Sequence, residues 1–89
     1  MEEKECTMVK EAFLQTVMDH AKKRGLKKTR LAAQAFPEEG DSLRKLNRLL
    51  KEEQQLNICD AFDLAKAIGE PLSHLILDVE GRMRGVLPA

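Results

Sequence analysis

The sequence predicts an all-α domain, a compact bundle of five short helices. Apolar residues recur at helical spacing in five separate segments, which glycines, prolines and polar runs divide. The apolar residues are mainly Leu, Ile, Val, Ala and Met, with three Phe and neither Tyr nor Trp, a composition that suits packed helices better than sheets. At 89 residues, the chain has room for one small domain with a single modest core.

The first helix is expected over residues 8–24, where apolar side chains recur every three or four positions. Thr7 can cap its start, and Gly25 can supply the left-handed residue that ends it. Its last turn carries three cations, which suit the negative end of the helix dipole: Lys22, Lys23 and Arg24.

The second helix is expected over residues 28–36. Pro37 stops it, because proline disfavours helical geometry in the residue before it and donates no backbone hydrogen bond. The following "PEEGD" is typical of a turn, in which Gly40 is free to adopt a positive φ. Asp41 or Ser42 can then cap the next helix.

The third helix is expected over residues 42–52, with an apolar stripe on one side and a basic face on the other. The stripe consists of Leu43, Leu46, Leu49 and Leu50. The side chains expected to point away from it are Arg44, Lys45, Arg48 and Lys51. Ser42 and Asn47 fall on the flanks between these two faces.

The fourth helix follows the polar break "EEQQLN" and ends at Gly69. Asn57, with Asp60 three residues later, resembles a pair of capping residues. An apolar stripe is expected to face the core through Ile58, Ala61, Phe62, Ala65 and Ile68. Cys59 flanks this stripe and is read as a small packed side chain.

Pro71 opens a fifth helix over residues 71–77, which is expected to bury Leu72, Leu75 and Ile76. The tail, residues 78–89, shows no helical period and is expected to be loose in the monomer, and a strand over residues 79–87 that pairs with a partner chain is the alternative. The chain thus divides into an extension of residues 1–7, a domain of residues 8–77 and this tail. So small a core cannot cover every apolar side chain of the fifth helix and the tail. We therefore expect these two segments to form a dimer surface, with the side chains of Leu75, Leu77, Val79, Met83, Val86 and Leu87.

The charges are strongly segregated although they sum to zero. The net charge is −3 in residues 1–20 (two Lys and Arg against five Asp and Glu) and +7 in residues 21–51 (ten against three). It is −6 in residues 52–80 (one against seven) and +2 in residues 81–89 (two against none). A solvated charged face is one interpretation. The other is a single surface for a polyanion, with the remainder of the protein repelling it.

Two segments resemble the DNA-binding domain of the phage-repressor family, the Cro and lambda-repressor type of helix-turn-helix protein. "LKKTRLAAQAF" is similar to the second helix of that family, and "NICDAFDLAKAIGEPLSHLIL" to its closing segment. The resemblance covers residues 9–77. It departs from the family at the turn, where Phe36 and Pro37 replace an early glycine, and at Lys28, which replaces a glutamine.

This resemblance implies a lambda-repressor-like fold and a transcriptional regulator, of phage or prophage repressor type, that binds double-stranded DNA. It implies that the third helix enters the major groove while the second crosses the phosphate backbone. The side chains that would reach base edges are Ser42, Arg44, Lys45, Asn47 and Arg48. Those that would hold phosphates are Lys27, Lys28, Thr29, Arg30, Gln34 and Lys51. A homodimer on a pseudo-palindromic operator is expected, because one such helix reads few base pairs.

No catalytic or metal-binding pattern occurs, so we expect no enzyme, no cofactor and no metal. His20 and His74 lie far apart in the sequence and are read as surface or rim residues, while Cys6 and Cys59 form no CxxC pair. No apolar run approaches the ~20 residues that span a membrane, and the acidic start does not resemble a signal peptide. A cytoplasmic protein without a membrane partner is therefore expected.

An alternative function is a helical protein-interaction module, such as the antitoxin of a toxin–antitoxin pair. Antitoxins often resemble this repressor family, and they bind a toxin as well as DNA. In this chain, the acidic segment of residues 52–80 or the tail would dock the toxin.

Overall fold

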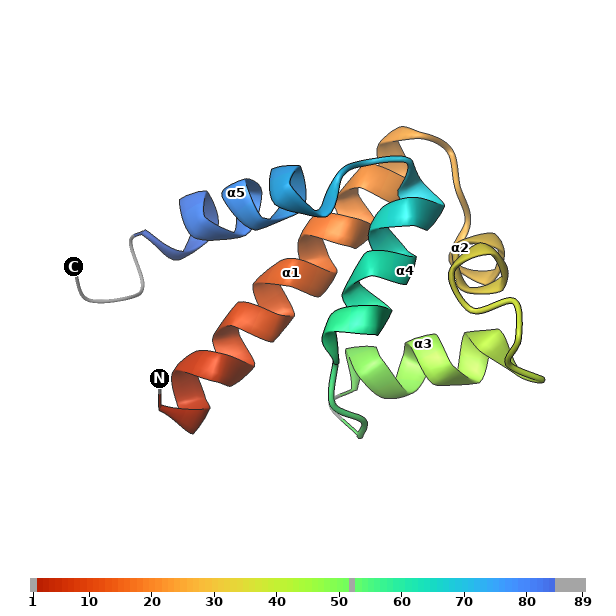
Figure 1. The fold of residues 1–89 in the computed structure, drawn as a ribbon, viewed down its shortest axis with the longest axis horizontal. Coiled ribbons are helices and arrows are strands. Elements are labelled where there is room, and N and C mark those ends of the chain that lie inside the picture. Colours follow the sequence, from red (N-terminus) through yellow and green to blue (C-terminus); the bar gives the residue numbers. More distant parts are fainter. Residues whose placement is uncertain (1, 52, 85–89) are drawn as a thin grey trace.

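The computed structural model describes residues 2–51 and 53–84, and these residues form five helices and no strand (Figure 1). The all-helical class predicted from the sequence is confirmed. The helices are α1 (Glu3–Lys23), α2 (Lys28–Ala35), α3 (Ser42–Leu50), α4 (Ile58–Ile68) and α5 (Leu72–Met83).

Helix α4 occupies the middle of the fold and contacts α1, α2 and α5. Helix α5 lies along α1 on one side of it, while α2 and α3 pack together on the other. Figure 1 shows the start of α1 and the end of α5 on the side of the molecule away from α2 and α3. The connection from α2 to α3 therefore lies at one end of the molecule.

The core lies between these helices and is built almost wholly from aliphatic side chains. Each helix contributes at least one fully or almost fully buried residue, and the largest of these side chains are Val17, Leu31, Leu46, Leu49, Leu64, Ile68 and Leu75. Thr16 is buried among them, and its hydroxyl donates to the carbonyl oxygen of Ala12 at 2.8 Å. A buried hydroxyl that bonds within its own helix adds no unsatisfied donor to the core.

Helix α1 starts earlier than the sequence predicted. It begins at Glu3 instead of residue 8, so Thr7 lies inside the helix and is not its cap. Glu3 and Glu5 lie in the first turn, where their charges favour the positive end of the helix dipole. The prediction for the other end is confirmed, because the last turn is basic and Gly25 follows with φ 68°.

The segment between α2 and α3 follows the predicted chemistry except at Gly40. Phe36 caps the end of α2 and is buried. Asp41 caps α3, since its Oδ1 accepts a hydrogen bond of 3.0 Å from the backbone N–H of Arg44. The expected positive φ of Gly40 is wrong, because only Gly25 and Gly69 have positive φ among the described glycines. Helix α3 ends at Leu50, two residues earlier than expected.

Helix α4 has the predicted ends but a different buried face. Asn57 Oδ1 accepts the backbone N–H of Asp60 at 2.7 Å, and Gly69 ends the helix with φ 72°. Ile58 and Phe62, however, are 65% and 58% exposed, so the expected stripe is wrong at these positions. The buried face is centred on Leu64, and the two exposed residues fall beyond its edge.

The exposed side of α4 also includes Cys59, which the sequence analysis treated as packed. Both cysteines, Cys6 and Cys59, are free and exposed. The prediction for Cys59 is wrong because it assumed an apolar stripe shifted toward Ile58, and the stripe lies further round the helix. No disulfide or thiol packing contributes to this fold.

Helix α5 extends through Met83, so the prediction of a loose tail is wrong for residues 78–83, and the alternative strand is wrong for 79–83. Val79 and Met83 continue the buried position of Leu75 at intervals of four residues. Gly81 conceals this period in the sequence, although it lies on the exposed side of the helix. Residues 86 and 87, named above for a dimer surface, lie outside the described residues.

The apolar side chains of α5 therefore divide into two groups. Leu75, Val79 and Met83 are buried within the chain and cannot supply a dimer surface without unfolding the helix from α1. Leu77 and Ile76 are 64% and 41% exposed, so the expected burial of Ile76 is wrong. Leu72 is partly buried against the core.

Polar contacts between side chains join α5 and the end of α4 to α1. The His20 imidazole lies 3.1 Å from the Asp78 carboxylate, and Arg82 donates to Asp19. This hydrogen bond from Arg82, with one from Gln15, holds the pKa of Asp19 below its ordinary value. Both histidines lie at the surface as expected. Each has a carboxylate neighbour that was not predicted from the sequence: Asp78 for His20 and Glu70 for His74.

Arg24 at the end of α1 forms an ion pair of 2.8 Å with Glu70, just after α4. The hydrogen bond from Arg24 lowers the pKa of the Glu70 carboxyl below its ordinary value, and His74 contributes in the same direction. A carboxyl group with a lowered pKa in the folded state stabilises that state at neutral pH. This contribution is lost as the pH falls through the folded-state pKa.

Replacing a central core side chain should destabilise the fold far more than replacing an exposed one of the same type. We expect Leu64→Ala to lower the free energy of unfolding by about 2–5 kcal/mol, because Leu64 is fully buried and its truncation leaves a cavity in the core. Leu77→Ala is the matched control and should change stability little. Urea denaturation followed by circular dichroism measures both, and equal losses would contradict this description of the core.

The Arg24–Glu70 pair should contribute to acid sensitivity. In Arg24→Gln, the pKa of Glu70 should rise toward its ordinary value of 4.5, so the variant should be less stable than the wild type at neutral pH. The difference should shrink as the pH falls below that value, where Glu70 is protonated in both proteins. Urea midpoints across this pH range test the expectation, with Lys22→Gln as control, and a difference independent of pH would contradict it.

Candidate nucleic-acid interface

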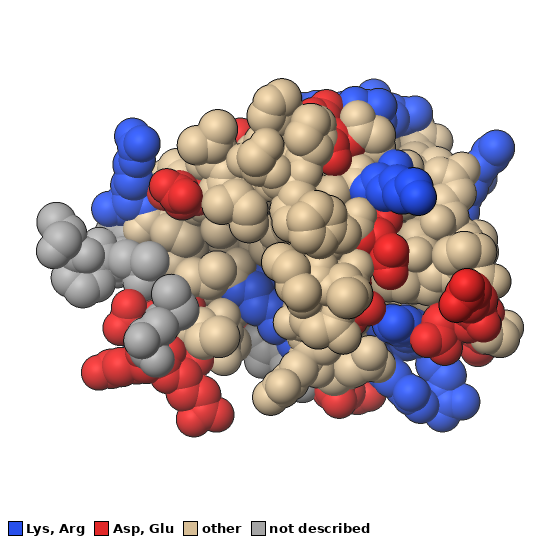
Figure 2. All heavy atoms as spheres, viewed as in Figure 1, with Lys and Arg blue, Asp and Glu red and all other residues tan. Residues whose placement is uncertain are grey.

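The basic block of residues 21–51 folds into the end of α1, α2, α3 and their connections. Figure 2 shows Lys and Arg near α3 and near the connection from α1 to α2, and acidic residues near the start of α1, with a further acidic group beside the basic residues at the far end of α3. The segregation of charge along the sequence is therefore partly retained in space. One end of the molecule presents most of the positive charge.

Helix α3 presents an outward stripe of polar side chains that we call the α3 stripe, composed of Arg44, Asn47, Arg48 and Lys51. These residues recur at intervals of three and four, so they share one face of the helix. Leu46 and Leu49 are fully buried on the opposite face. The capping of α3 by Asp41 and the burial of these two leucines thus fix which side chains face outward.

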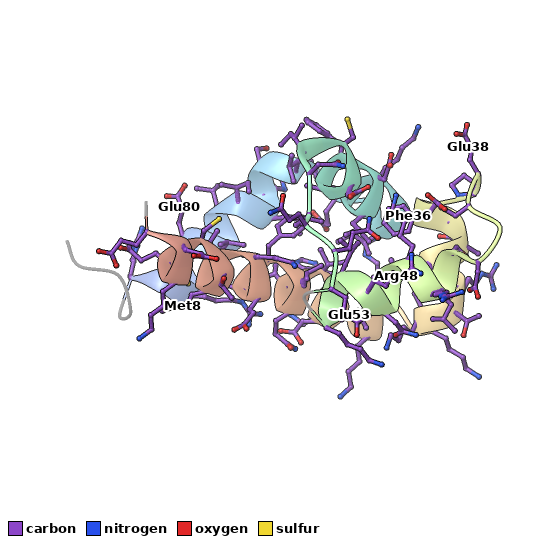
Figure 3. All side chains as sticks on the ribbon, turned by 90° about the horizontal axis from the view of Figure 1, so that it is seen from below. Met8, Phe36, Glu38, Arg48, Glu53 and Glu80 are labelled. Atoms are coloured by element: carbon purple, nitrogen blue, oxygen red, sulfur yellow. The ribbon has the colours of Figure 1, made fainter. Side chains whose placement is uncertain are left out.

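The α3 stripe lines a shallow groove on the surface of the protein. Asp41 and Leu43 lie at one end of this groove and Glu53 at the other. Figure 3 shows Arg48 on the side of α3 turned toward the viewer, with Glu53 beyond the end of the helix. Glu38 projects from the turn between α2 and α3, away from the rest of the molecule.

The cations of the α3 stripe are available to an external partner. Arg44, Arg48 and Lys51 are exposed, and within residues 2–51 and 53–84 they form no ion pair. Asn47 is half-buried and lines the same groove. Ser42, the first residue of α3, is half-buried and lies outside the lining of the groove.

The start of α2 is unusual because it is basic and uncapped. Lys27 is its N-cap residue and makes no capping hydrogen bond from its side chain, and the first turn contains no acidic residue. Cations at a helix N-terminus oppose the helix dipole, so these residues do not stabilise the helix. Exposed cations beside free backbone N–H groups favour an anion. The residues predicted to hold phosphates are all exposed here: Lys27, Lys28, Thr29, Arg30 and Gln34.

Lys45 differs from its neighbours on α3, because its side chain turns inward and is only 19% exposed. Its Nζ lies 3.1 Å from Asp60 Oδ1 and 3.4 Å from Glu39 Oε1. The same nitrogen lies 4.5 Å from the centre of the Phe36 ring. The expectation that Lys45 points away from the apolar face with the other cations is therefore wrong.

The charge of Lys45 is stabilised in this position. Burial by itself would lower the pKa of the Lys45 ammonium, but the Asp60 carboxylate, together with Glu39, outweighs it and raises the pKa above its ordinary value. An aromatic ring near a cation adds a further attraction. The sequence contained no signal for this contact, because the burial of Asp60 beside Ala61 and Leu64 depends on which face of α4 packs inward.

No family model, curated protein or solved structure matches the chain. No cluster of three or more His, Cys, Asp or Glu that could hold a metal ion occurs among the described residues. None of the helices in that part of the chain combines the length and apolar character needed to cross a lipid bilayer. The function must therefore be inferred from the geometry and charge of the α3 stripe and the start of α2.

Proposed function

We propose that this protein is a sequence-specific DNA-binding transcriptional regulator, a repressor of the lambda-repressor-like helix-turn-helix type. The observation that carries the proposal is the α3 stripe, in which Arg44, Asn47, Arg48 and Lys51 share one outward face and form no ion pair within the described residues. In this proposal, α2 and α3 form the helix-turn-helix and α3 is the recognition helix.

The chemistry of the α3 stripe suits the edges of DNA bases. A guanidinium can donate to O6 and N7 of guanine at once, and an Asn side chain can pair with N6 and N7 of adenine. An α-helix fits the major groove of B-DNA, which is about 12 Å wide. Arg44, Asn47 and Arg48 would read bases, with Ser42 at the start of the helix beside them. Lys51, one turn beyond Arg48, would bind a phosphate.

The start of α2 would bind the phosphate backbone. Lys27, Lys28 and Arg30 supply charge, and the uncapped N–H groups of the first turn supply directed donors. Thr29 and Gln34 are exposed on the same helix and can donate to phosphate oxygens. These contacts are independent of sequence and would set the position of α3 on the duplex.

A homodimer would read a pseudo-palindromic operator, because a single recognition helix contacts too few base pairs for useful specificity. The candidate dimer surface is the exposed apolar area of α4 and α5, formed by Ile58, Phe62, Ile76 and Leu77. Figure 2 shows an uncharged area over these two helices. A second copy on this surface would leave the α3 stripe free on both subunits. If the surface instead serves a different protein, the function is that of the alternative interaction module.

Base reading and phosphate binding should separate in two substitutions. Arg48→Ala should weaken binding to the preferred sequence by about 1–3 kcal/mol and relax specificity at one position. Lys28→Ala should weaken binding to all duplexes alike and reduce the salt dependence of the affinity. Fluorescence anisotropy on specific and random duplexes measures both, with Lys66→Ala on α4 as a control outside the site. Equal effects of Arg48→Ala on specific and random DNA would refute its role in base reading.

The preferred sequence can be found by selecting bound duplexes from a random library at about 150 mM salt, where weak non-specific binding is suppressed. We expect an inverted repeat whose half-sites lie about one helical turn apart. A folded protein that recovers no motif would overturn the proposal and favour the interaction module.

The dimer surface can be tested separately from DNA chemistry. Leu77→Lys places a charge in the exposed apolar area without touching the core, so the variant should stay folded but sediment as a monomer. Its affinity for the full inverted repeat should fall toward that for a single half-site. Asp63→Lys, on an exposed position of α4 outside this area, is the control. If the wild-type protein sediments as a monomer with and without DNA, the proposed homodimer is wrong.

A further inference from the structure

One buried charge lies close behind the proposed recognition helix. Asp60, in the first turn of α4, is the only buried charged residue among those described. Its side chain is 4% exposed, and its Oδ1 faces Lys45 Nζ at 3.1 Å. Its Oδ2 has no hydrogen-bond partner within the described chain.

The buried Lys45–Asp60 pair contributes little to stability compared with apolar residues in the same place. Burying a carboxylate is costly, and the cost is offset only when the geometry is good and every oxygen is satisfied. Here one oxygen of Asp60 is unsatisfied, and Lys45 is itself largely desolvated. Apolar residues of similar volume often stabilise a protein as well as such a pair does. The Lys45–Asp60 pair, unlike apolar residues, fixes the direction between two atoms, Lys45 Nζ and Asp60 Oδ1.

The direction matters because burial of Leu46 and Leu49 selects the face of α3 that turns inward, whereas a directed polar contact can hold the helix at one rotation within that face. Helix α3 packs chiefly against α2, and its fully buried side chains are Leu46 and Leu49. The Lys45 ammonium reaches three other segments: the end of α2 at Phe36, the turn at Glu39 and the first turn of α4 at Asp60. Figure 3 shows Phe36 where α2, α3 and α4 meet. A side chain held from three directions resists rotation of the helix that carries it.

We propose that Asp60 is a positioning residue, which acts through Lys45 to fix the rotation of α3 and so the direction of the α3 stripe. Lys45 adjoins Arg44 and precedes Arg48 by three residues, so a rotation of α3 moves both guanidinium groups relative to a bound duplex. Lys45 is then basic and on the recognition helix, but it binds Asp60 and not DNA. This inference rests on the proposed function.

The test compares Lys45→Met, Asp60→Asn and the apolar double variant Lys45→Met/Asp60→Leu with the wild type. Affinities for the selected operator and for a random duplex are measured across salt concentrations. Each single variant should lose roughly tenfold in operator affinity, whereas random-duplex affinity and salt dependence should stay unchanged. The double variant should lose no more than either single variant, because all three remove the same contact.

Lys51→Met is the matched control, since it removes a neighbouring cation of α3 that is exposed. It should reduce the salt dependence on both duplexes. If Lys45→Met behaves like this control, or if the losses of the two single variants add in the double variant, the positioning role is overturned. The double variant buries no unpaired charge, so it keeps the test possible if a single variant does not fold.

A measurement without DNA separates this inference from the proposed function. Residual dipolar couplings of the backbone N–H groups report the orientation of α3 relative to α4 in the wild type and in Asp60→Asn. We expect a changed orientation in the variant, and an unchanged one would overturn the positioning role. If the wild type binds no duplex at all, the proposed function fails, and the couplings alone decide whether Asp60 positions α3.

Discussion

Burial of one face of α4 is the interaction on which the rest of this fold depends. Leu64 and Ile68 are almost fully buried, and through its contacts with α1, α2 and α5 helix α4 joins the α1–α5 pair to the α2–α3 pair. In a chain of 89 residues, a core of this size supplies only a modest excess over the conformational entropy of folding. The surface charges are consequently arranged around a scaffold with little stability to spare.

That scaffold accounts for the distribution of charge. Where a helix end needs electrostatic support, the support is present: acids begin α1, cations end it, and Asp41 and Asn57 cap α3 and α4. The start of α5 also has no side-chain cap and no acidic residue in its first turn, but the start of α2 adds cations to these features, with Lys27 as an N-cap residue that makes no side-chain capping bond. An electrostatic arrangement that opposes the local helix dipole is a cost without a structural benefit. The cations at the start of α2 have a function if this helix end binds an anion, because the cations and the free backbone N–H groups both attract negative charge.

The sequence predicted what depends on local chemistry and failed where the outcome depends on packing between distant residues. Gly25, Gly69, Asp41 and Asn57 end or cap helices as their backbone preferences require. The buried face of α4 could not be located by periodicity, because Ile58 and Phe62 fit a helical stripe as well as Leu64 does. The inward turn of Lys45 depends on a carboxylate fifteen positions further along the chain. The continuation of α5 was hidden by Gly81, whose cost to a helix is outweighed by the burial of Val79 and Met83.

The positions of the start of α1 and the end of α5 have a practical consequence for how this domain can be used. The first and last described residues lie beside α1 and α5, away from the connection between α2 and α3 (Figure 1). A fluorescent protein or a tether joined directly before the start of α1 or after the end of α5 would project away from the basic end of the molecule. The domain can therefore be immobilised or fused as a unit with its polar groove still open to large ligands.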